Sequence, residues 1–418
     1  MHGCAPKVAA PHYPREISLR LRQTLSGTTM NKLITLLPLA LATAIPTPSS
    51  AAPGAFTVKT VNSLAIARTS QTIELSAKEL APLEAKALNL IHVKDASGKE
   101  VLCQAVDTDF DALHKPDVLI FQADFAPSET KTFTVSVGAK QVFSKAQFRA
   151  HGRFVRERFD DFAWENDRIA HRMYGQGLET WAGEPLTSST VDIWSKRVPQ
   201  MVIDDWYLVD NYHTDTGTGA DFYSAGLSRG CGGNGLWADG KLWVSRNFVN
   251  SRVLANGPVR VCFELVYAAF DVNGAKVSEV KRITLDAGSN LDHFQSFYQP
   301  PASADPLVCG IGLKKVAGAQ KVFNAEHGWL GIWEKVEKNQ GMQGVGIVVE
   351  AQAEPQTAED KLNNLLLVKA TPAKKVSYWA GFAWDKTGLF ADFAAWQEYL
   401  DKFAQGLAAP IQVSVAAQ

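Results

Sequence analysis

The stretch Val259–Asp286 reads VRVCFELVYAAFDVNGAKVSEVKRITLD and carries the clearest β pattern of the chain. Apolar and polar residues alternate on both sides of Asn273-Gly274, a dipeptide typical of a tight hairpin turn. Side chains along a strand point to opposite faces in turn, so the pattern predicts a hairpin with one apolar and one polar face. A further strand is predicted at 291–298.

The polar face of this predicted sheet carries several charged or hydrogen-bonding side chains: Arg260, Glu264, Arg282 and Thr284, with His293 or Gln295 extending it. Exposure to solvent is the simplest explanation for such a face. A concave ligand-binding surface explains it as well, and the sequence leaves both open.

Strand patterns also occur on both sides of this stretch, at 56–61, 90–93, 101–104, 118–123, 132–137, 344–350, 365–368 and 376–384. The chain is therefore predicted to be mainly β, with an N-terminal β-rich region at 52–145 and a larger β region at 146–418. One helix is expected over 389–405, capped by Thr387. Its apolar residues recur at helical spacing and are assigned to the core: Leu389, Phe393, Trp396, Leu400 and Phe403.

The composition indicates a globular protein and gives no sign of nucleic-acid binding. The 418 residues are 46% hydrophobic and 20% charged, which is typical of a globular protein, and the formal net charge is −1. Because no long basic stripe appears, no nucleic-acid partner is predicted. The chain has 11 Trp and nine Tyr, which serve either as platforms for sugar rings or as ordinary core residues.

Residues 30–51 indicate an exported protein. Met30-Asn-Lys32 gives a short positive start, an apolar run follows, and Ser49-Ser-Ala51 supplies a small-residue cleavage site. The apolar run is too short to span a bilayer, so this segment is interpreted as a signal peptide and no membrane span is predicted. Residues 1–29 are interpreted as an extension that precedes the true start, and the mature protein is expected in the periplasm or secreted.

Four cysteines remain in the mature chain: Cys103, Cys231, Cys262 and Cys309. Export permits disulfides, and three pairings are possible, but a chain of this length also folds with free buried thiols. No cysteine spacing suggests a structural zinc site. No cofactor is predicted. A divalent metal held by His171, His213, Asp215 and His327 is kept as an alternative.

The stretch 204–250 is the densest in chemical groups. Within 18 positions it places six polar or aromatic side chains among many glycines: Tyr212, His213, Asp215, Asp221, Tyr223 and Arg229. Glycine weakens helices and strands, so we expect a long loop that brings its backbone close to a ligand. A connecting loop with chance polar residues is the alternative.

A second polar cluster runs from Trp164 to Tyr174. Read as one strand, it places Glu165, Asp167 and His171 on one face and Arg168 and Arg172 on the other. Charge on both faces suits a strand that lines a wet cleft. Ion pairs at a domain edge are the alternative.

Three motifs resemble a bacterial secreted family, the domain of unknown function 4861: FAWENDRIAHRMYG at 162–175, YHTDTGTGADFY at 212–223 and SRGCGG at 228–233. The resemblance covers most of the mature chain. It implies an association with degradation of polysaccharides, pectin and other uronate-containing glycans among them. The strand pattern around 257–286 resembles the galactose-mutarotase-like β-supersandwich, a fold that also occurs in polysaccharide lyases and some glycosidases. The family implies no particular reaction.

An oligosaccharide that contains uronate is therefore the expected substrate, cleaved or dehydrated by elimination. The reaction needs a base, an acid and a cation for the developing charge. We assign His213 as base and Tyr174 or Tyr223 as acid, with His171 and Tyr212 as further candidates. The carboxylate is assigned to Arg172 or Arg229, with Arg168 beside them. Further substrate contacts are expected from Glu165, Asp215, Asp221 and Trp164.

Two other functions stay open. A glycoside hydrolase would use paired carboxylates, for which the candidates are Glu165, Asp167, Asp210, Asp215 and Asp221. A non-catalytic periplasmic carbohydrate-binding protein also fits the aromatic content. All of these readings require that the segments 165–174 and 212–229 line one sugar-sized hollow.

Overall fold

The predicted hairpin lies in the largest sheet of the computed structural model, which describes residues 54–108, 115–182, 186, 189–209, 211–301 and 307–416. Asn273 and Gly274 form the turn, both with positive φ, as this hairpin turn requires. The predicted extension 1–29, the predicted signal peptide 30–51 and Asp210 lie outside the described residues.

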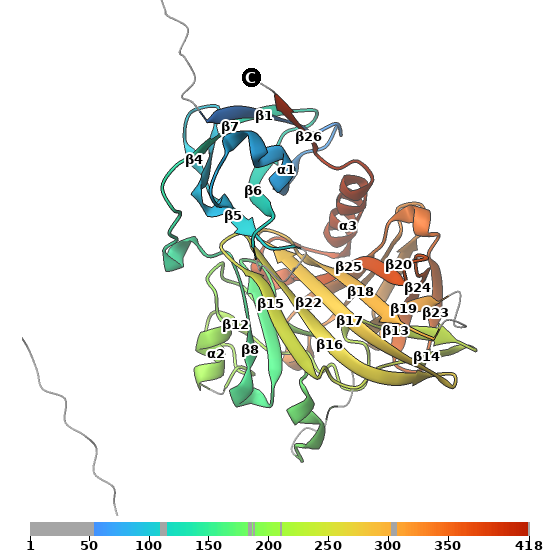
Figure 1. Cartoon of the computed structure of the whole chain (residues 1–418). Helices are drawn as coiled ribbons and strands as arrows, with labels where there is room; N and C mark the ends of the chain where they lie inside the picture. The colour runs from blue at the N-terminus through green and yellow to red at the C-terminus, as the bar shows by residue number, and fades with distance from the viewer. Residues whose placement is uncertain are drawn as a thin grey trace, which may run out of the picture. The chain divides into compact units, whose positions relative to one another are not determined.

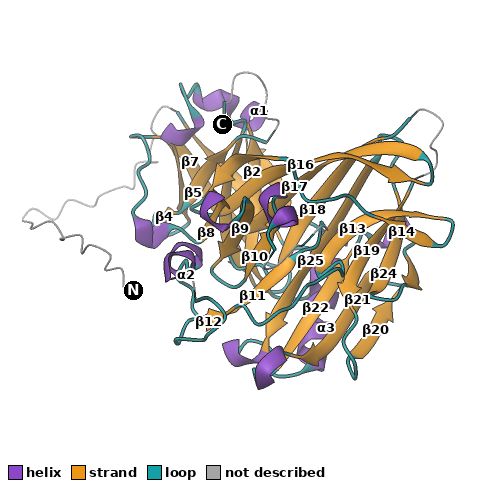
Figure 2. Cartoon of the chain, turned by 90° about the horizontal axis from the view of Figure 1, so that it is seen from below, coloured by secondary structure: helices purple, strands orange, loops and turns teal. Residues whose placement is uncertain are grey.

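Eight antiparallel strands form this sheet (Figure 2), in the order β15 (Asn250–Asn256), β16 (Arg260–Val272), β17 (Ala275–Asp286), β18 (Leu291–Gln299), β25 (Lys375–Trp384), β22 (Met342–Val348), β21 (Trp329–Lys335) and β20 (Gln320–Asn324). Its inner face packs against two five-stranded sheets. One has the order β14 (Lys241–Trp243), β13 (Cys231–Ala238), β19 (Val308–Lys314), β24 (Asn363–Lys369) and β23 (Gln356–Glu359). The other has the order β12 (Gly219–Ala220), β11 (Asp192–Lys196), β10 (Ala170–Met173), β9 (Asp161–Asn166) and β8 (Ala150–Val155).

The main core lies between these layers. Phe162 from β9, Phe263 from β16, Ile311 from β19 and Val345 from β22 all belong to it and are fully buried. Apolar side chains that alternate along strands of both layers interdigitate there, as expected for a β-sandwich. The prediction of a mainly β, sandwich-type chain with a short C-terminal helix is confirmed.

The N-terminal region contributes two more sheets. One runs β26 (Gln412–Ala416), β1 (Ala55–Val61), β7 (Thr130–Val137), β3 (Ile91–Asp95) and β4 (Glu100–Val101), and the other runs β2 (Arg68–Ser76), β6 (Val118–Phe125) and β5 (Cys103–Val106). Figure 1 shows that the C-terminal strand β26 lies beside β1, a pairing that the sequence did not predict. The residues Ala51–Gln418 form one compact unit.

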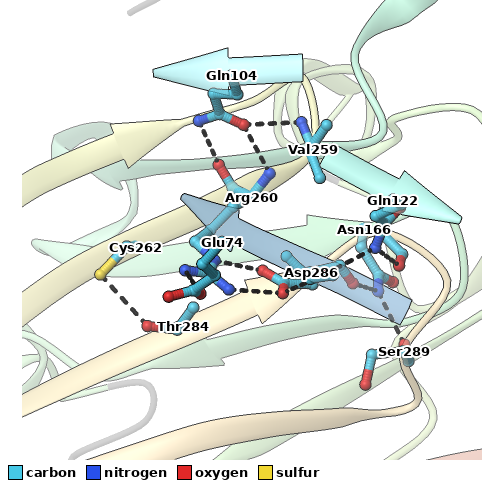
Figure 3. A network of polar contacts seen from close by, with 12 residues as sticks. Glu74, Gln104, Gln122, Asn166, Val259, Arg260, Cys262, Thr284, Asp286 and Ser289 are labelled. Atoms are coloured by element: carbon cyan, nitrogen blue, oxygen red, sulfur yellow. Dashed lines mark hydrogen bonds and ion pairs between the residues drawn. The ribbon is translucent and has the colours of Figure 1, made fainter. Parts of the chain in front are cut away.

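The polar face of the hairpin meets the N-terminal region (Figure 3). Arg260 Nε and Nη2 donate to the two carboxylate oxygens of Asp286 at 2.5 and 2.8 Å, and Nη1 lies 2.7 Å from Glu74 of β2. Gln104 of β5 accepts from the backbone N–H groups of Val259 and Arg260 at 2.8 Å. Part of the predicted polar face is therefore covered by protein rather than by solvent.

The predicted helix starts later than expected. Helix α3 (Phe393–Ala408) is capped by Asp392, whose side chain accepts from the Ala395 N–H. Thr387 instead donates to the Trp384 carbonyl in a preceding turn, and Leu389 is 54% exposed. A carboxylate at the helix N-terminus is favoured by the helix dipole, which explains why Asp392 is the cap. Trp396 and Leu400 are buried, as predicted.

Several glycines that were expected in a loop belong to strand β13. Gly232 has φ +95° at a register shift of β13 against β19, and a Cβ there would lie 2.3 Å from the Ala380 Cβ of β25. The glycine therefore lets the two layers approach each other, and the expectation of a continuous loop over 204–250 is wrong. Helix α2 (Ile203–Val209) also interrupts it.

Replacing Gly232 by alanine is expected to lower the free energy of unfolding by about 1–3 kcal/mol more than Gly240→Ala does, because the added methyl overpacks the core. Gly240 is a matched control, since its φ is also positive, +71°, but nothing lies within 4 Å of its added Cβ. Urea unfolding followed by tryptophan fluorescence measures both. Equal losses would show that the contact with Ala380 has no energetic importance.

Cys103, Cys231, Cys262 and Cys309 are all free and buried, so of the two possibilities the structure has free thiols. No helix within the described ranges is long and apolar enough to cross a bilayer.

Candidate functional site

The segment 162–174 folds as a hairpin rather than as one strand. β9 and β10 pair antiparallel around a short turn. Because side chains alternate along each strand, Glu165 and Arg172 point to one face of the hairpin, and Trp164 and His171 point to the other. The expected division of the segment into faces is therefore wrong, since the turn changes which residues share a face.

The face with Trp164 and His171 points into the core. Trp164 Nε1 donates to Asp292 Oδ1 at 2.7 Å, and His171 Nε2 lies 2.9 Å from Asp292 Oδ2. The Trp164 and His171 rings stack with centroids 5.1 Å apart, and none of the three residues has exposed surface. A ligand cannot reach these groups, so we leave both residues out of the proposed site.

Glu165, on the other face, is also fully buried. Its Oε1 accepts from the backbone N–H groups of Val202 and Ile203 at 2.7 and 2.8 Å, at the start of α2. Its Oε2 accepts from Lys196 Nζ at 2.6 Å. Burial lowers the pKa of Lys196, while the Glu165 carboxylate opposes that shift. Glu165 thus anchors helix α2 to the sheet and offers no oxygen to a substrate.

Arg172 is the centre of a buried polar cluster. Its Nε donates to Asp192 Oδ2 at 2.8 Å, while Nη2 lies 3.5 Å from Asp221 Oδ2 and Nη1 lies 3.6 Å from Asp161 Oδ2. The hydroxyl of Tyr174 donates to the same Asp192 oxygen at 3.0 Å. Arg172 is only 2% exposed, so its guanidinium is surrounded by the protein's own carboxylates.

Burial shifts the protonation of this cluster. It raises the pKa of Asp161 to about 7, against the lowering effect of the nearby Arg172 cation. It also raises the pKa of Asp192, again against Arg172. For Arg172, burial lowers the pKa, but its anionic neighbours outweigh that effect and the net shift is upward. The cluster therefore holds its cation firmly, and a substrate carboxylate would have to displace an internal one.

The two predicted segments do meet here. The Tyr212 hydroxyl accepts from Arg158 Nε at 2.6 Å and from Arg172 Nη1 at 3.4 Å. His213 follows with a half-exposed side chain, and its Nδ1 lies 3.6 Å from Asp221 Oδ2. Tyr174, Arg172, Tyr212, His213 and Asp221 thus form one cluster, but it is a packed polar core rather than a hollow.

The remaining predicted residues lie apart from this cluster. Asp215 pairs with Arg197 and accepts from the Gly217 N–H at 2.8 Å, which braces its own loop. Arg229 is 2% exposed and donates to Ser189 Oγ at 3.4 Å, and burial lowers its pKa to about 10. Arg168 is partly buried next to the turn of the hairpin.

The proposed metal ligands do not converge. His327 Nδ1 lies 2.7 Å from Asp401, whereas His171 is enclosed in the core beside Asp292. In the part of the chain that the structure describes, no group of three or more His, Cys, Asp or Glu side chains is placed to hold a metal ion.

A hollow of about 160 Å³ lies beside Phe222 and Tyr223, outside the Arg172 cluster. It is lined by Phe222, Tyr223, Lys314, Lys315, Val316, Glu334, Lys335, Glu337 and Gln343. Three lysines and two glutamates line it, and Lys315 is already paired with Glu359 at 2.8 Å. Tyr223 is the only predicted catalytic residue among these lining residues.

Two buried acids in the hollow have an oxygen without a partner. Glu334 is 1% exposed, and its Oε1 accepts from Gln343 Nε2 at 2.7 Å, but its Oε2 has no hydrogen-bond partner among the described residues. The Tyr223 hydroxyl is likewise buried without such a partner. Each of these buried oxygens therefore lacks the partner that such an atom usually has, which calls for an explanation.

The protonation of both acids is shifted. Burial raises the pKa of Glu334 to about 7, while the Gln343 hydrogen bond and the Lys314 cation oppose the shift. Burial also raises the pKa of Tyr223 far above its usual range, and the nearby Glu334 carboxylate adds to that rise. A carboxyl group that titrates near neutrality beside a protonated phenol is suited to acid–base chemistry.

The sequence model of the family described as Domain of unknown function (DUF4861) matches residues 60–413. The chain belongs to this family. A relative from Formosa agariphila, described as "Uncharacterized protein P7", is 31% identical over 369 residues, which cover 85% of this chain and 92% of that protein. The family resemblance of the three motifs is thereby confirmed.

Two solved structures from Enterococcus faecalis are similar at low identity. One is described as an alpha-mannosidase (12% identity, TM-score 0.44, 87% of this chain), and the other as a protein in the Glycosyl Hydrolase Family 38 (14%, 0.49, 88%). The chain spans 46% and 48% of these two structures, about half of each.

All lining residues of the hollow lie within the part of the chain that matches DUF4861.

Glu334 was not predicted from the sequence, although the residue pattern of its strand could have indicated it. In WLGIWEK of β21, Leu330 and Ile332 point to the core, and Glu334 continues the same face. A carboxylate on the apolar face of a strand is rarely tolerated without a function or a partner.

Proposed function

We propose that this DUF4861 protein is an exported, carbohydrate-active enzyme that acts on uronate-containing oligosaccharides by elimination or dehydration. The observation that carries the proposal is the pair of proton-carrying groups, Glu334 and Tyr223, that line one lysine-rich hollow. The predicted signal peptide supports an extracytoplasmic location.

The lysines supply the cation that the reaction requires. Lys314 Nζ lies 5.2 Å above the Tyr223 ring and 3.4 Å from Glu337 Oε1, so its charge is held beside Tyr223 and Glu337. A uronate carboxylate bound there would acidify the adjacent C5–H bond, because the cation stabilises the negative charge that develops on its removal.

Glu334 then acts as base and Tyr223 as acid. The carboxylate of Glu334 takes the proton from C5, the electrons of that bond form the C4–C5 double bond, and the bond from C4 to its oxygen substituent breaks. Tyr223 gives its proton to the departing oxygen. A base whose pKa lies near the working pH is effective, because it is both ionised and basic enough.

These assignments differ from those made from sequence alone. Tyr223 keeps its role as acid. Glu334 replaces His213 as base, because His213 is not among the residues that line the hollow. Lys314 replaces Arg172 and Arg229, whose guanidinium groups are buried by protein contacts.

A glycoside hydrolase is the second candidate function, and Glu337 favours it. Glu337 lines the same hollow as Glu334, so the two form a carboxyl pair in which burial keeps one member protonated to near pH 7. In that reaction Glu334 would be the general acid and Glu337 the second carboxylate.

Product analysis separates the candidates. The purified protein is incubated with oligogalacturonides, both saturated and with an unsaturated non-reducing end, and ultraviolet absorbance and reducing ends are followed. New absorbance from a C4–C5 double bond supports elimination or dehydration. New reducing ends without absorbance support hydrolysis, and binding without either product would mean a carbohydrate-binding protein and would overturn the proposal.

The pH dependence is expected to identify the role of Glu334. As a base it acts only when ionised, so kcat/KM should rise through about pH 7 and level off above it. As a general acid it acts only when protonated, so kcat/KM should fall above about pH 7. A profile without any inflection near pH 7 would remove Glu334 from the mechanism.

A further inference from the structure

A second and larger cavity, of about 330 Å³, lies on the outer face of the eight-stranded sheet. Its floor includes Thr284 of β17, His293 of β18 and Trp379 of β25. One wall is the start of β2, and the other is helix α3. Cavities of this size where separate structural parts meet are frequent ligand sites.

The floor contains two aromatic rings that stack on each other. The rings of His293 and Trp379 stack with centroids 4.4 Å apart and an interplanar angle of 9°. His293 Nε2 is hydrogen-bonded to Ser377 Oγ at 2.7 Å, and Nδ1 has no hydrogen-bond partner among the described residues. Burial lowers the pKa of His293 to about 4, and the Arg260 and Lys375 charges add to the effect, so the imidazole is neutral at pH 7.

The β2 wall is distorted at the cavity. Ser70 has φ +52°, a left-handed conformation that is unusual for a residue other than glycine, and the register of β2 against β6 shifts between Arg68 and Gln71. A bulge of this kind redirects side chains, and such features are common at binding sites. The bulge brings Ser70 and its hydroxyl group to the edge of the cavity. Thr72 also lines the cavity, but its Oγ1 donates to Asp286 Oδ2 at 2.7 Å and accepts from Gln122 Nε2 at 3.2 Å.

The charged side chains of the lining already have partners within the protein, which favours an uncharged ligand; Lys402 Nζ lies 2.6 Å from Glu398 Oε1. The Arg260 guanidinium is already engaged by Asp286 and Glu74, and Arg68 donates to the carbonyl groups of Gly406 and Ala409 at the end of α3. The ionised Asp286 would repel a second carboxylate. Figure 3 shows Arg260 between Asp286 and Glu74, and shows Thr284 of the floor hydrogen-bonded to Cys262 Sγ at 3.3 Å.

We infer that this cavity binds a neutral pyranose unit of a saccharide. The stacked Trp379 and His293 rings offer apolar contact to the sugar, and His293 Nδ1 and the Ser70 hydroxyl hydrogen-bond its hydroxyls. The inference does not depend on the reaction proposed for the Glu334 hollow, since it concerns binding at a separate place.

Ligand-observed saturation-transfer NMR tests the inference with the methyl glycosides of glucose, mannose, galactose and rhamnose, and with methyl galacturonide as the anionic comparison. At least one neutral glycoside should bind, with the galacturonide weaker. Trp379→Ala should weaken that binding about tenfold or more. Glu334→Gln should leave it unchanged, which separates this site from the proposed catalytic hollow.

Lys402→Trp provides a second variant in case loss of Trp379 disturbs folding. Lys402 is an exposed lining residue on α3, so the larger side chain should block the cavity without touching the core. Ala394→Trp is the matched control, because it adds the same side chain at an exposed position of the helix outside the lining. Failure of every neutral glycoside to bind, or equal binding to both variants, would overturn the inference.

Discussion

Arg172→Met is expected to lower the free energy of unfolding by about 3–5 kcal/mol at pH 8, because it leaves buried carboxylates without their cation. Asp192, Asp221 and Asp161 all lie within 3.6 Å of the guanidinium. Methionine fills a similar volume, so the loss reports charge rather than a cavity. Urea unfolding followed by tryptophan fluorescence measures it.

The loss should shrink at lower pH. The pKa of Asp161 is raised to about 7 in the folded chain, whereas an unfolded aspartate titrates near 4, so between these values folding requires proton uptake. The contribution of Asp161 to the free energy of unfolding therefore falls as pH rises from about 4 to about 7. Without Arg172 the carboxyl pKa rises further, so Arg172→Met should be markedly less harmful at pH 5 than at pH 8.

Arg156→Met is the control for this prediction. Arg156 is an exposed arginine on a surface turn of the same region, and its replacement is expected to change stability by less than about 0.5 kcal/mol. If Arg172→Met cost no more than Arg156→Met, the buried cluster would not contribute to stability.

Glu334→Gln is expected to reduce kcat/KM by about 10²–10⁴-fold, the usual contribution of a general base or acid. Glutamine has the same shape and can keep the hydrogen bond from Gln343, so the fold should persist. Initial rates on the oligogalacturonide that the wild-type protein consumes provide the measurement. Full activity in this variant would remove Glu334 from the mechanism.

The same variant should gain stability in alkaline conditions. The folded pKa of Glu334 is about 7 against an unfolded value near 4.5, so its ionisation costs up to about 3 kcal/mol above pH 7 and nothing below pH 4. Glutamine avoids that cost. Lower activity with higher stability at pH 8 would mark Glu334 as a functional residue, since a purely structural residue would lose stability on replacement.

Two further variants complete the test. Glu326→Gln, at an exposed position outside the hollow, should leave activity unchanged. Glu337→Gln distinguishes the two reactions, because a hydrolase would lose its second carboxylate, whereas elimination would retain most of its activity.

The local β patterns were readable from the sequence because they depend on neighbouring residues. Asn273-Gly274 determines its own turn, and alternation identifies the strands around it. The start of helix α3 was misplaced because Thr387 and Asp392 are both suitable caps, and the structure uses Asp392, whose carboxylate is also favoured by the helix dipole.

The candidate site was harder to predict because its members are distant in sequence. Arg172 was taken for a substrate clamp, since nothing near it in the chain reveals that Asp192 and Asp221 enclose it. Conversely, Glu334 becomes distinctive only when its strand is placed in the core with Tyr223 beside it. Charge density along the sequence thus identified a buried polar cluster, while the hollow of the proposed reaction contains a carboxylate, Glu334, that the sequence did not single out.

The pairing of β26 with β1 joins the two ends of the described chain. The amino-terminal sheet consequently cannot be completed until residues 412–416 have been synthesised, and a nascent polypeptide carries β1 with one side unpaired throughout translation. Late closure of this kind delays completion of the native amino-terminal sheet. Deleting 411–416 would leave that edge permanently available for intermolecular association.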